Sequence, residues 1–344
     1  MRIVVLHQDA SEEATVDERD VLNQRDAVID ALARCGHDVT SWSCTLDLSR
    51  TRRRLEEFRP DVVFNLVESL GGTDRLMPLA TLLLESLALP HTGSGTRSIL
   101  ATSEKVRAKE RLRELGLPTP DWVSLHGDPF DRDARPRFDR PWILKTVWEH
   151  ASFGIQDESV LTPETSSQLR ARLREREGRT GRPHFAEPYI EGREFNVSLL
   201  ASAADPNEPV VLPIAEIDFS RFPPGKPRIV GHSAKWSADS FEFESTPRCF
   251  DDGLEDAPLR ERLGALATRC WSAFDIGGYA RVDFRVDPSG QPWILEVNVN
   301  PCLTPDAGFA AALARAGISY DDAMERIVDS SIPAHGDPGC TRRS

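Results

Sequence analysis

Residues 281–301 have the sequence Arg281-Val-Asp-Phe-Arg-Val-Asp-Pro-Ser-Gly-Gln-Pro-Trp-Ile-Leu-Glu-Val-Asn-Val-Asn-Pro301. Two alternating runs flank Asp-Pro-Ser-Gly, which has the composition of a tight turn, and this pattern predicts a β-hairpin. Because side chains alternate between the two faces of a strand, the polar residues Arg281, Asp283, Glu296 and Asn298 share one face. The other face carries the apolar residues Val282, Phe284, Val286, Leu295, Val297 and Val299.

The polar face of this hairpin predicts a metal site. We expect Val286 to pair with Gln291, which places Arg281 opposite Glu296 and Asp283 one diagonal step away, about 7–8 Å between backbones. Carboxylates at that separation can share a cation. Two acids and an amide oxygen suit magnesium that holds a polyphosphate, because the remaining ligands then come from phosphate and water. Asp283, Glu296 and Asn298 are therefore the predicted metal ligands.

Length and composition limit the class of protein. A chain of 344 residues predicts two or three domains. A formal charge of −13 argues against nucleic-acid binding. The sequence starts directly with an expected strand and not with a signal peptide, and no apolar run approaches the roughly 20 residues that span a bilayer. The six cysteines are scattered, as is typical of free thiols in a reducing cytosol. We expect a cytoplasmic protein with neither a nucleic-acid nor a membrane partner.

Lysine is scarce in this chain. Of 42 basic residues only five are lysine, at positions 105, 109, 145, 226 and 235. A lysine supplies a compact point charge that the planar guanidinium of arginine does not reproduce. Each remaining lysine is therefore a candidate for a position that needs a compact point charge, and this inference gains weight where the position coincides with another signal.

The order of expected elements divides the chain into three regions and a tail. Residues 1–98 alternate strands and helices, as in a βαβ half-sheet. Residues 99–190 begin a second unit with a helix that ends near Gly116. Residues 191–330 contain strands, the opening hairpin and a long irregular segment, 220–253, which we expect to be a mobile loop because loops of that length are usually functional or disordered. Residues 331–344 are an expected disordered tail.

Six short segments, in order within residues 60–330, resemble the ATP-grasp superfamily and within it the D-alanine–D-alanine ligase family. The resemblance implies an α/β (α+β) ATP-grasp fold with three domains: a Rossmann-like pre-ATP-grasp domain (1–98), a central ATP-grasp subdomain (99–190) and a carboxyl-terminal ATP-grasp subdomain (191–330). The segments are His91-Thr-Gly-Ser-Gly95, Leu117-Pro118, the strand around Lys145, Glu187-x-x-Ile-x-Gly-x-Glu194, Ser233-Ala-Lys235 and Leu295-Glu-Val-Asn-x-x-Pro301.

The resemblance implies a role for each matching residue. Lys105 and Lys145 match the two lysines that reach the nucleotide phosphates. Glu187 and Ile190 match the contacts to adenine, and Glu194 matches the glutamate that grips the ribose. The implied cofactors are ATP and Mg²⁺, with Mn²⁺ as a substitute.

The same resemblance implies the catalytic residues. Arg281 matches the arginine that stabilises the transferring phosphate, and Lys235 matches the lysine of the mobile loop over the site. Ser152 is the serine that remains from the family's Gly-Ser-Ser loop. Asp283, Glu296 and Asn298 match the family's three metal ligands, as the hairpin alone already predicts.

The amino-acid side of the family's site is not reproduced. A serine of the loop over the first substrate becomes Ala151, and a tyrosine beside the loop lysine becomes Trp236. Cys302 replaces the glycine whose amide helps form the oxyanion site, and Ala307 replaces the serine that binds the acceptor carboxylate. The glutamate that binds the first amine is not securely placed, and Glu18 and Asp20 are the best candidates.

We therefore predict an ADP-forming carboxylate–amine ligase that acts through an acyl phosphate and has an altered amino-acid site. Its partners are small amino-acid or carboxylate substrates, and a homodimer is compatible with the resemblance. The alternatives are an authentic D-alanine–D-alanine ligase of cell-wall precursor synthesis, an ATP-grasp kinase and a non-catalytic nucleotide-binding module. The last is disfavoured, because Arg281 and all three metal ligands are present.

Overall fold

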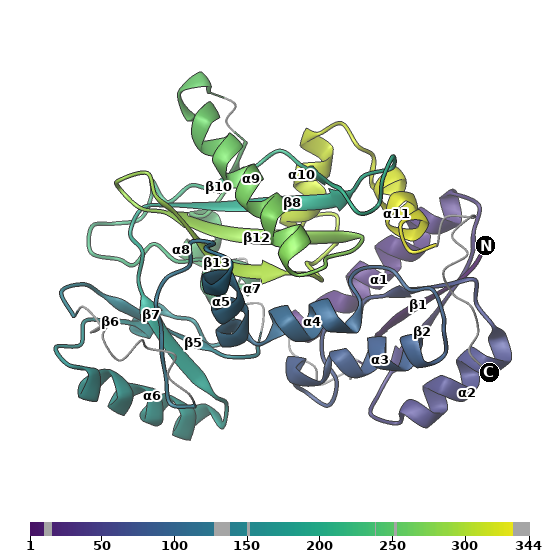
Figure 1. The fold of residues 1–344 in the computed structure, drawn as a ribbon, viewed down its shortest axis with the longest axis horizontal. Coiled ribbons are helices and arrows are strands. Elements are labelled where there is room, and N and C mark those ends of the chain that lie inside the picture. Colours follow the sequence, from purple (N-terminus) through teal and green to yellow (C-terminus); the bar gives the residue numbers. More distant parts are fainter. Residues whose placement is uncertain (10–15, 127–137, 150–151, 238, 251–252, 333–344) are drawn as a thin grey trace.

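The computed structural model describes residues 1–9, 16–126, 138–149, 152–237, 239–250 and 253–332. Within these residues the chain forms three β-sheets, each accompanied by helices (Figure 1). This mixture agrees with the predicted α/β class. In the described part of the chain, no helix combines the length and the apolar character needed to cross a membrane.

The amino-terminal sheet is parallel and has the strand order β2-β1-β3. Its central strand is buried from Ile3 to Leu6, as expected of a parallel strand that is covered on both faces. Figure 1 draws this unit in purple and blue. Its elements are β1 (Arg2–Gln8), α1 (Val16–Arg34), β2 (Asp38–Cys44), α2 (Leu48–Phe58), β3 (Val62–Asn65), the 3-10 helix η1 (Asp74–Leu76) and α3 (Pro78–Ser86).

The second sheet is antiparallel and has the order β4-β7-β5-β6. Helix α6 packs on it through Leu169 and Leu173, which share an apolar cluster with Trp142 and Leu144. Two helices, α4 and α5, precede the sheet in the chain. The elements are α4 (Thr96–Ser103), α5 (Lys105–Glu114), β4 (Val123–Ser124), β5 (Trp142–Thr146), η2 (Asp157–Ser159), β6 (Val160–Leu161), α6 (Ser166–Thr180) and β7 (His184–Pro188).

The third sheet is antiparallel, with the order β11-β10-β8-β12-β13, and β9 also pairs with β8. Helix α9 covers one face, where Leu263 and Trp271 join the cluster of Val282 and Phe284. The expected irregular segment 220–253 is only partly irregular, because it contains α7, α8 and β11. The elements are β8 (Arg193–Ala201), β9 (Pro209–Val211), β10 (Ala215–Ile217), α7 (His232–Trp236), α8 (Phe241–Glu244), β11 (Arg248–Cys249), η3 (Leu254–Asp256), α9 (Ala257–Ala273), β12 (Tyr279–Val286) and β13 (Pro292–Asn298).

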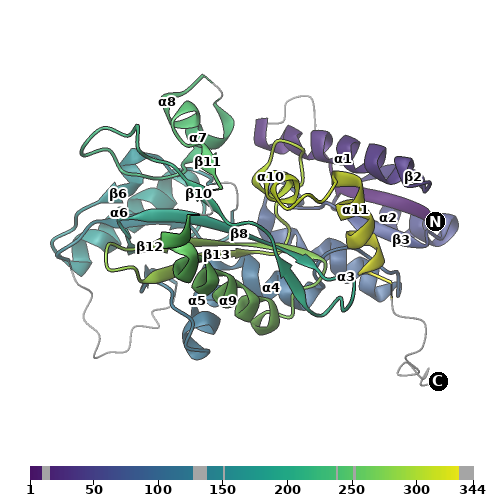
Figure 2. The same ribbon diagram turned by 90° about the horizontal axis from the view of Figure 1, so that it is seen from above.

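Two closing helices, α10 (Gly308–Arg315) and α11 (Tyr320–Asp329), return to the amino-terminal sheet. Figure 2 shows them beside α1 and β1. Phe309 and Ile327 belong to the same apolar cluster as Ile3 and Val5. The two closing helices therefore pack the third unit against the first. Of the expected tail, residues 333–344 lie outside the described residues.

Candidate active site

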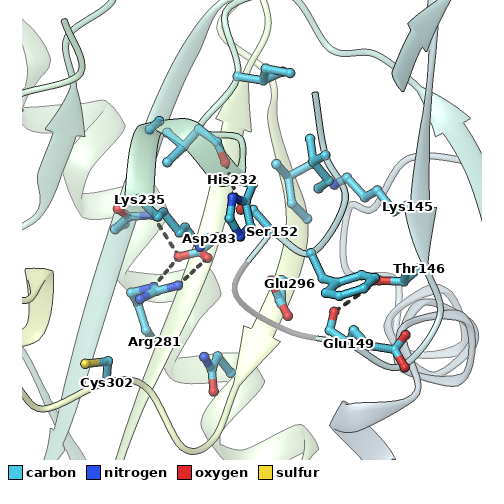
Figure 3. A pocket seen from close by; sticks show the side chains of 18 of the residues that line it. Lys145, Thr146, Glu149, Ser152, His232, Lys235, Arg281, Asp283, Glu296 and Cys302 are labelled. Atoms are coloured by element: carbon cyan, nitrogen blue, oxygen red, sulfur yellow. Dashed lines mark hydrogen bonds and ion pairs between the residues drawn. The ribbon is translucent and has the colours of Figure 1, made fainter. Parts of the chain in front are cut away.

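A cavity of about 1240 Å³ is lined by residues from all three sheets. Every residue predicted for the site lines this cavity, although the residues come from distant parts of the sequence. Figure 3 shows Arg281 and Asp283 on one side of it and Lys145 on the other, with Glu296 between them. The predicted residues are Lys105, Lys145, Ser152, Glu187, Ile190, Glu194, Lys235, Arg281, Asp283, Glu296 and Asn298.

The predicted hairpin forms as β12 and β13, but its register differs from the expected one. Val286 pairs with Pro292 and not with Gln291, and the register shifts between Asp283 and Phe284. Asp283 therefore lies directly opposite Glu296, while Arg281 lies opposite Asn298. The expected pairing of Arg281 with Glu296 was wrong, because simple alternation of side chains does not reveal a β-bulge.

The bulge also changes which residues of β13 face the cavity. Ile294 is fully buried and Val297 is 1% exposed, whereas Leu295 lines the cavity next to Glu296. Leu295 was expected on the apolar face with Val297, and this expectation was wrong for the same reason. The extra residue lets two consecutive side chains, one apolar and one acidic, point toward the cavity.

Arg281 and Asp283 form a fixed pair on β12. The Nε and Nη2 atoms of Arg281 donate to the two carboxylate oxygens of Asp283 at 2.7 and 2.9 Å. Asn196 on β8, which the sequence analysis did not identify, donates to Asp283 Oδ1 at 2.8 Å. Burial alone would lower the pKa of Arg281, but Asp283 and Glu296 raise it overall, so the guanidinium stays charged. A permanent cation thus lies beside the predicted metal ligands.

The donor set of Asp283, Glu296 and Asn298 fits magnesium. It offers two carboxylates and one amide oxygen along one edge of the cavity. The backbone amide of Asn300 donates to Asn298 Oδ1 at 2.9 Å, which fixes the orientation of that side chain. Hard oxygen donors of this kind are the ligands that magnesium prefers. Lys105 Nζ lies 3.4 Å from Glu296 Oε1, so one of the predicted phosphate-binding lysines adjoins the predicted metal ligands.

Glu187 holds two lysines at the far end of the cavity. Its carboxylate oxygens lie 2.6 Å from Lys145 Nζ and 2.7 Å from Lys109 Nζ, and both Glu187 and Lys109 are 1% exposed. Burial alone would raise the pKa of Glu187, but the two lysines lower it overall. Lys109 also donates to Thr119 Oγ1 at 2.8 Å. The scarcity of lysine pointed to Lys109, but only the fold reveals its partner.

Glu194, predicted to hold the ribose, is paired with an arginine. Arg285 Nη2 lies 3.0 Å from Glu194 Oε2, and Arg285 also donates to Gly192 O at 3.1 Å and to the carbonyl of Arg228. Burial raises the pKa of Glu194. The sequence analysis missed Arg285, although it alternates with Arg281 and Asp283 along β12. Ile190 lines the cavity between Glu187 and Glu194 in the chain.

The segment 220–253 contacts the loop after β5 and covers the cavity from one side. Ser152, which has a positive φ of 60°, donates through Oγ to Val230 O at 2.8 Å. The amide of His232 donates to Ile155 O at 3.0 Å, and Lys226 bridges Asp157 at 2.5 Å and Glu242 at 2.8 Å. Lys235 follows on α7, where burial and the charge of Arg281 lower its pKa.

The other end of the cavity contains the residues that depart from the family pattern. Cys302 Sγ lies 3.3 Å from Asp20 Oδ2 and 3.1 Å from Thr304 Oγ1, and burial raises the pKa of its thiol to about 12. Asp20 lines the cavity, as do Trp236 and Ala307. Ala151 lies outside the described residues, and so does the side chain of Glu18.

Comparison with known proteins gives a consistent result. The family model described as D-ala D-ala ligase C-terminus matches residues 112–329. The D-alanine--D-alanine ligase of Methylococcus capsulatus is 31% identical over 92% of each chain. That of Moorella thermoacetica is 29% identical over 96% of this chain and 99% of its own. The crystal structure of D-alanine--D-alanine ligase from Bacillus anthracis complexed with ATP covers 96% of this chain and 97% of its own, with a TM-score of 0.70 and 23% identity.

Proposed function

Because the chain belongs to the D-alanine–D-alanine ligase family, and is thus an ATP-grasp ligase that forms a peptide-type C–N bond, we propose that it joins a pair of substrates other than two D-alanines. In this proposal a carboxylate oxygen of the first substrate attacks the γ-phosphorus of ATP, and ADP leaves. The amine of the second substrate then attacks the acyl phosphate, and inorganic phosphate leaves.

The charged side chains around the hairpin suit the phosphoryl-transfer step. We assign Lys105, Lys145 and Lys235 to the phosphates and Arg281 to the charge that develops on the transferring group. A bound magnesium ion, held by Asp283, Glu296 and Asn298, would neutralise phosphate charge. Such a step depends mainly on positioning and electrostatics, and the bidentate contact of Arg281 with Asp283 supports this assignment because it fixes the guanidinium before substrate arrives.

The nucleotide base and sugar are assigned to the end of the cavity near β7 and β8. Glu187 and Ile190 would contact adenine, and Glu194 would hold the ribose. The loop serine Ser152 and the segment 220–253 would exclude water, which otherwise hydrolyses an acyl phosphate. The contacts of Ser152 with Val230 and of His232 with Ile155 support this closure.

We also propose domain boundaries at residues 98, 190 and 330. Each sheet of the described chain falls within one of the resulting regions, which supports the division. We further propose that the chain forms a homodimer.

The side chains at positions 307 and 302, an alanine and a cysteine, are the main support for an altered amino-acid site. Ala307 is the N-cap of α10 and offers no side-chain hydrogen bond. Cys302 places a half-buried thiol against Asp20. A site built to hydrogen-bond a substrate discriminates sharply because its buried polar atoms must be paired. Loss of the serine hydroxyl and gain of a thiol therefore disfavour small D-amino acids bound through that hydroxyl.

The relatives from Methylococcus capsulatus and Moorella thermoacetica are named for D-alanine, so an authentic D-alanine–D-alanine ligase is the alternative function. The two functions are separated by an assay of ADP formation with a panel of amino-acid, dipeptide and hydroxy-acid pairs, in which product mass is measured. We expect D-alanine to be a poor substrate at both positions. We also expect Ala307→Ser to increase kcat/KM for D-alanine as acceptor by about tenfold, the value of one recovered hydrogen bond.

Ala311→Ser, one turn further along α10, is the matched control and should leave the use of D-alanine unchanged. D-Alanyl-D-alanine as the best product, with other pairs at background, would contradict the altered site and favour the alternative. ADP formation that depends on a hydroxyl substrate and not on an amine would instead indicate a kinase.

A further inference from the structure

Arg248 is a cation at the amino-acid end of the cavity for which the proposed function has no use. It lies on β11 in the segment 220–253, is exposed, and lines the cavity. Its Nη2 donates to the backbone carbonyl of Asp306 at 2.8 Å. Within the described residues, its guanidinium makes no ion pair with a carboxylate, in contrast to Arg281 and Arg285. The charge is therefore held in place by a neutral group.

The guanidinium lies over the first turn of α10. A side chain added at Gly308 would meet Arg248 Nη1 at 3.3 Å and Cδ at 3.7 Å, so the arginine packs directly on this turn. The turn begins at Ala307, which contributes no capping side chain, and both Ala307 and Gly308 line the cavity. The amino terminus of a helix carries partial positive charge and disfavours a cation nearby. Two positive features thus converge on one part of the cavity wall.

The charged groups around Arg248 differ from those around Cys302. Partial removal from water lowers the pKa of Arg248 most, and the charge of Arg281 lowers it further, whereas Asp306 and the thiol of Cys302 act in the opposite direction. Burial raises the pKa of Cys302, and the acids Glu68 and Asp20 raise it further. Cys302 is therefore influenced by acids that do not act on Arg248.

We propose that Arg248 is a specificity-determining residue that binds an anionic group, a carboxylate, of the amine substrate together with the first turn of α10. The inference rests on the proposed function and deepens it. The family binds the acceptor carboxylate through a serine hydroxyl at the position of Ala307, whereas this chain would recognise it through the charge of Arg248. A guanidinium pairs with a carboxylate through two parallel hydrogen bonds, so a neutral carboxamide of the same shape would be rejected.

The test compares acceptors as matched acids and amides. The probes are alanine, serine and phenylalanine of both configurations and their carboxamides, titrated calorimetrically into the full chain with a non-hydrolysable ATP analogue and magnesium. We expect the wild-type protein to bind the best acid roughly 10- to 100-fold more tightly than its amide, the value of a hydrogen bond to a charged group. Arg248→Leu should reduce this ratio to near one, and Arg248→Lys should retain part of it.

Arg221→Leu is the matched control, because Arg221 lies in the same segment, donates to the carbonyl of Glu244 and is absent from the cavity wall. It should keep the wild-type ratio. An unchanged ratio in Arg248→Leu, or no preference for any acid in the wild-type protein, would overturn the inference. Because binding is measured without turnover, this result stands apart from the proposed function, which fails if no pair in the ADP assay shows amine-dependent turnover.

Discussion

The two ends of the cavity differ in how they hold their charged side chains. At the end proposed for the nucleotide, Glu187 contacts Lys109 and Lys145 at 2.7 and 2.6 Å. At the end proposed for the amino acids, Arg248 contacts a backbone carbonyl and Asp20 contacts a thiol. Charges that are paired in a buried site are fixed before the ligand arrives, whereas a charge held by a neutral group is available to a new partner. This difference supports the proposal that the chain keeps the family's use of ATP and has an altered amino-acid site.

Of the tests of this difference between the two ends of the cavity, removal of the predicted metal ligands should have the largest effect. Glu296→Gln and Asn298→Ala should each lower kcat by about 10³-fold, the rate equivalent of several kcal/mol of lost charge stabilisation. Both side chains face the cavity and not the core, so thermal unfolding should be little changed. Steady-state ADP formation over a range of magnesium concentrations measures the effect.

Gln291→Ala is the control for these two variants, because Gln291 lies at the turn of the same hairpin and outside the cavity wall. Its turnover should match that of the wild-type enzyme. Wild-type turnover of Glu296→Gln and Asn298→Ala at saturating magnesium would remove the metal assignment.

The next test removes the ion pairs of Glu187 with Lys109 and Lys145, and its effect should depend on pH. Glu187→Gln leaves the buried Lys109 and the half-buried Lys145 without a counter-charge and should cost about 3–5 kcal/mol of unfolding free energy at neutral pH. The pKa of Glu187 is lowered in the folded state from its ordinary value of 4.5. Its ion pairs therefore stabilise the fold above that value, and this stabilisation is lost as the pH falls through the lower, folded-state pKa.

Urea unfolding of the wild-type protein and of Glu187→Gln at a series of pH values measures this difference. The difference in unfolding free energy between the wild-type protein and Glu187→Gln should become smaller as the pH is lowered below 4.5. Arg248→Leu, at the other end of the cavity, should change the unfolding free energy by less than about 0.5 kcal/mol, as is usual for a surface substitution. Equal losses of unfolding free energy in Glu187→Gln and Arg248→Leu would contradict the inference that the two ends of the cavity hold their charges differently.

The smallest expected effects come from conservative lysine substitutions. Lys145→Arg should lower kcat/KM about as much as Lys145→Ala, roughly 10²-fold, because a planar guanidinium does not replace an ammonium between Glu187 and a phosphate. Lys226→Arg should be close to neutral, since an arginine can keep the ion pairs with Asp157 and Glu242. Equal tolerance at both positions would mean that the scarcity of lysine carries no information about phosphate binding.

The sequence predicted those parts of the site whose chemistry is local. Asp283, Glu296 and Asn298 stand on one hairpin, and the segments around Lys145, Glu187 and Lys235 each carry a short pattern, so their order was sufficient to predict the ATP-grasp fold. Structural neighbours with a TM-score of 0.70 confirm that fold. The predicted placement of these residues around one cavity also agrees with the structure.

The features that escaped prediction depend on contacts between distant segments or on a single extra residue. The contact of Arg248 with the carbonyl of Asp306 joins positions 58 residues apart, and no local pattern signals it. The sequence analysis assigned Lys109 no role, and only the fold shows that it pairs with Glu187. The register of the hairpin was missed because alternation describes a regular strand, and Leu295 interrupts it.

That interruption has a consequence for comparing related sequences. The bulge divides the hairpin into a half near the turn, from Phe284 to Ile294, and a half that carries the acids, beyond Asp283 and Glu296. A length change in the turn can be absorbed within the first half. A gap at Leu295 cannot, because it would exchange the inward and outward side chains of one half relative to the other. An alignment that places a gap there has therefore assigned the wrong residues to the cavity, however well its remaining columns agree.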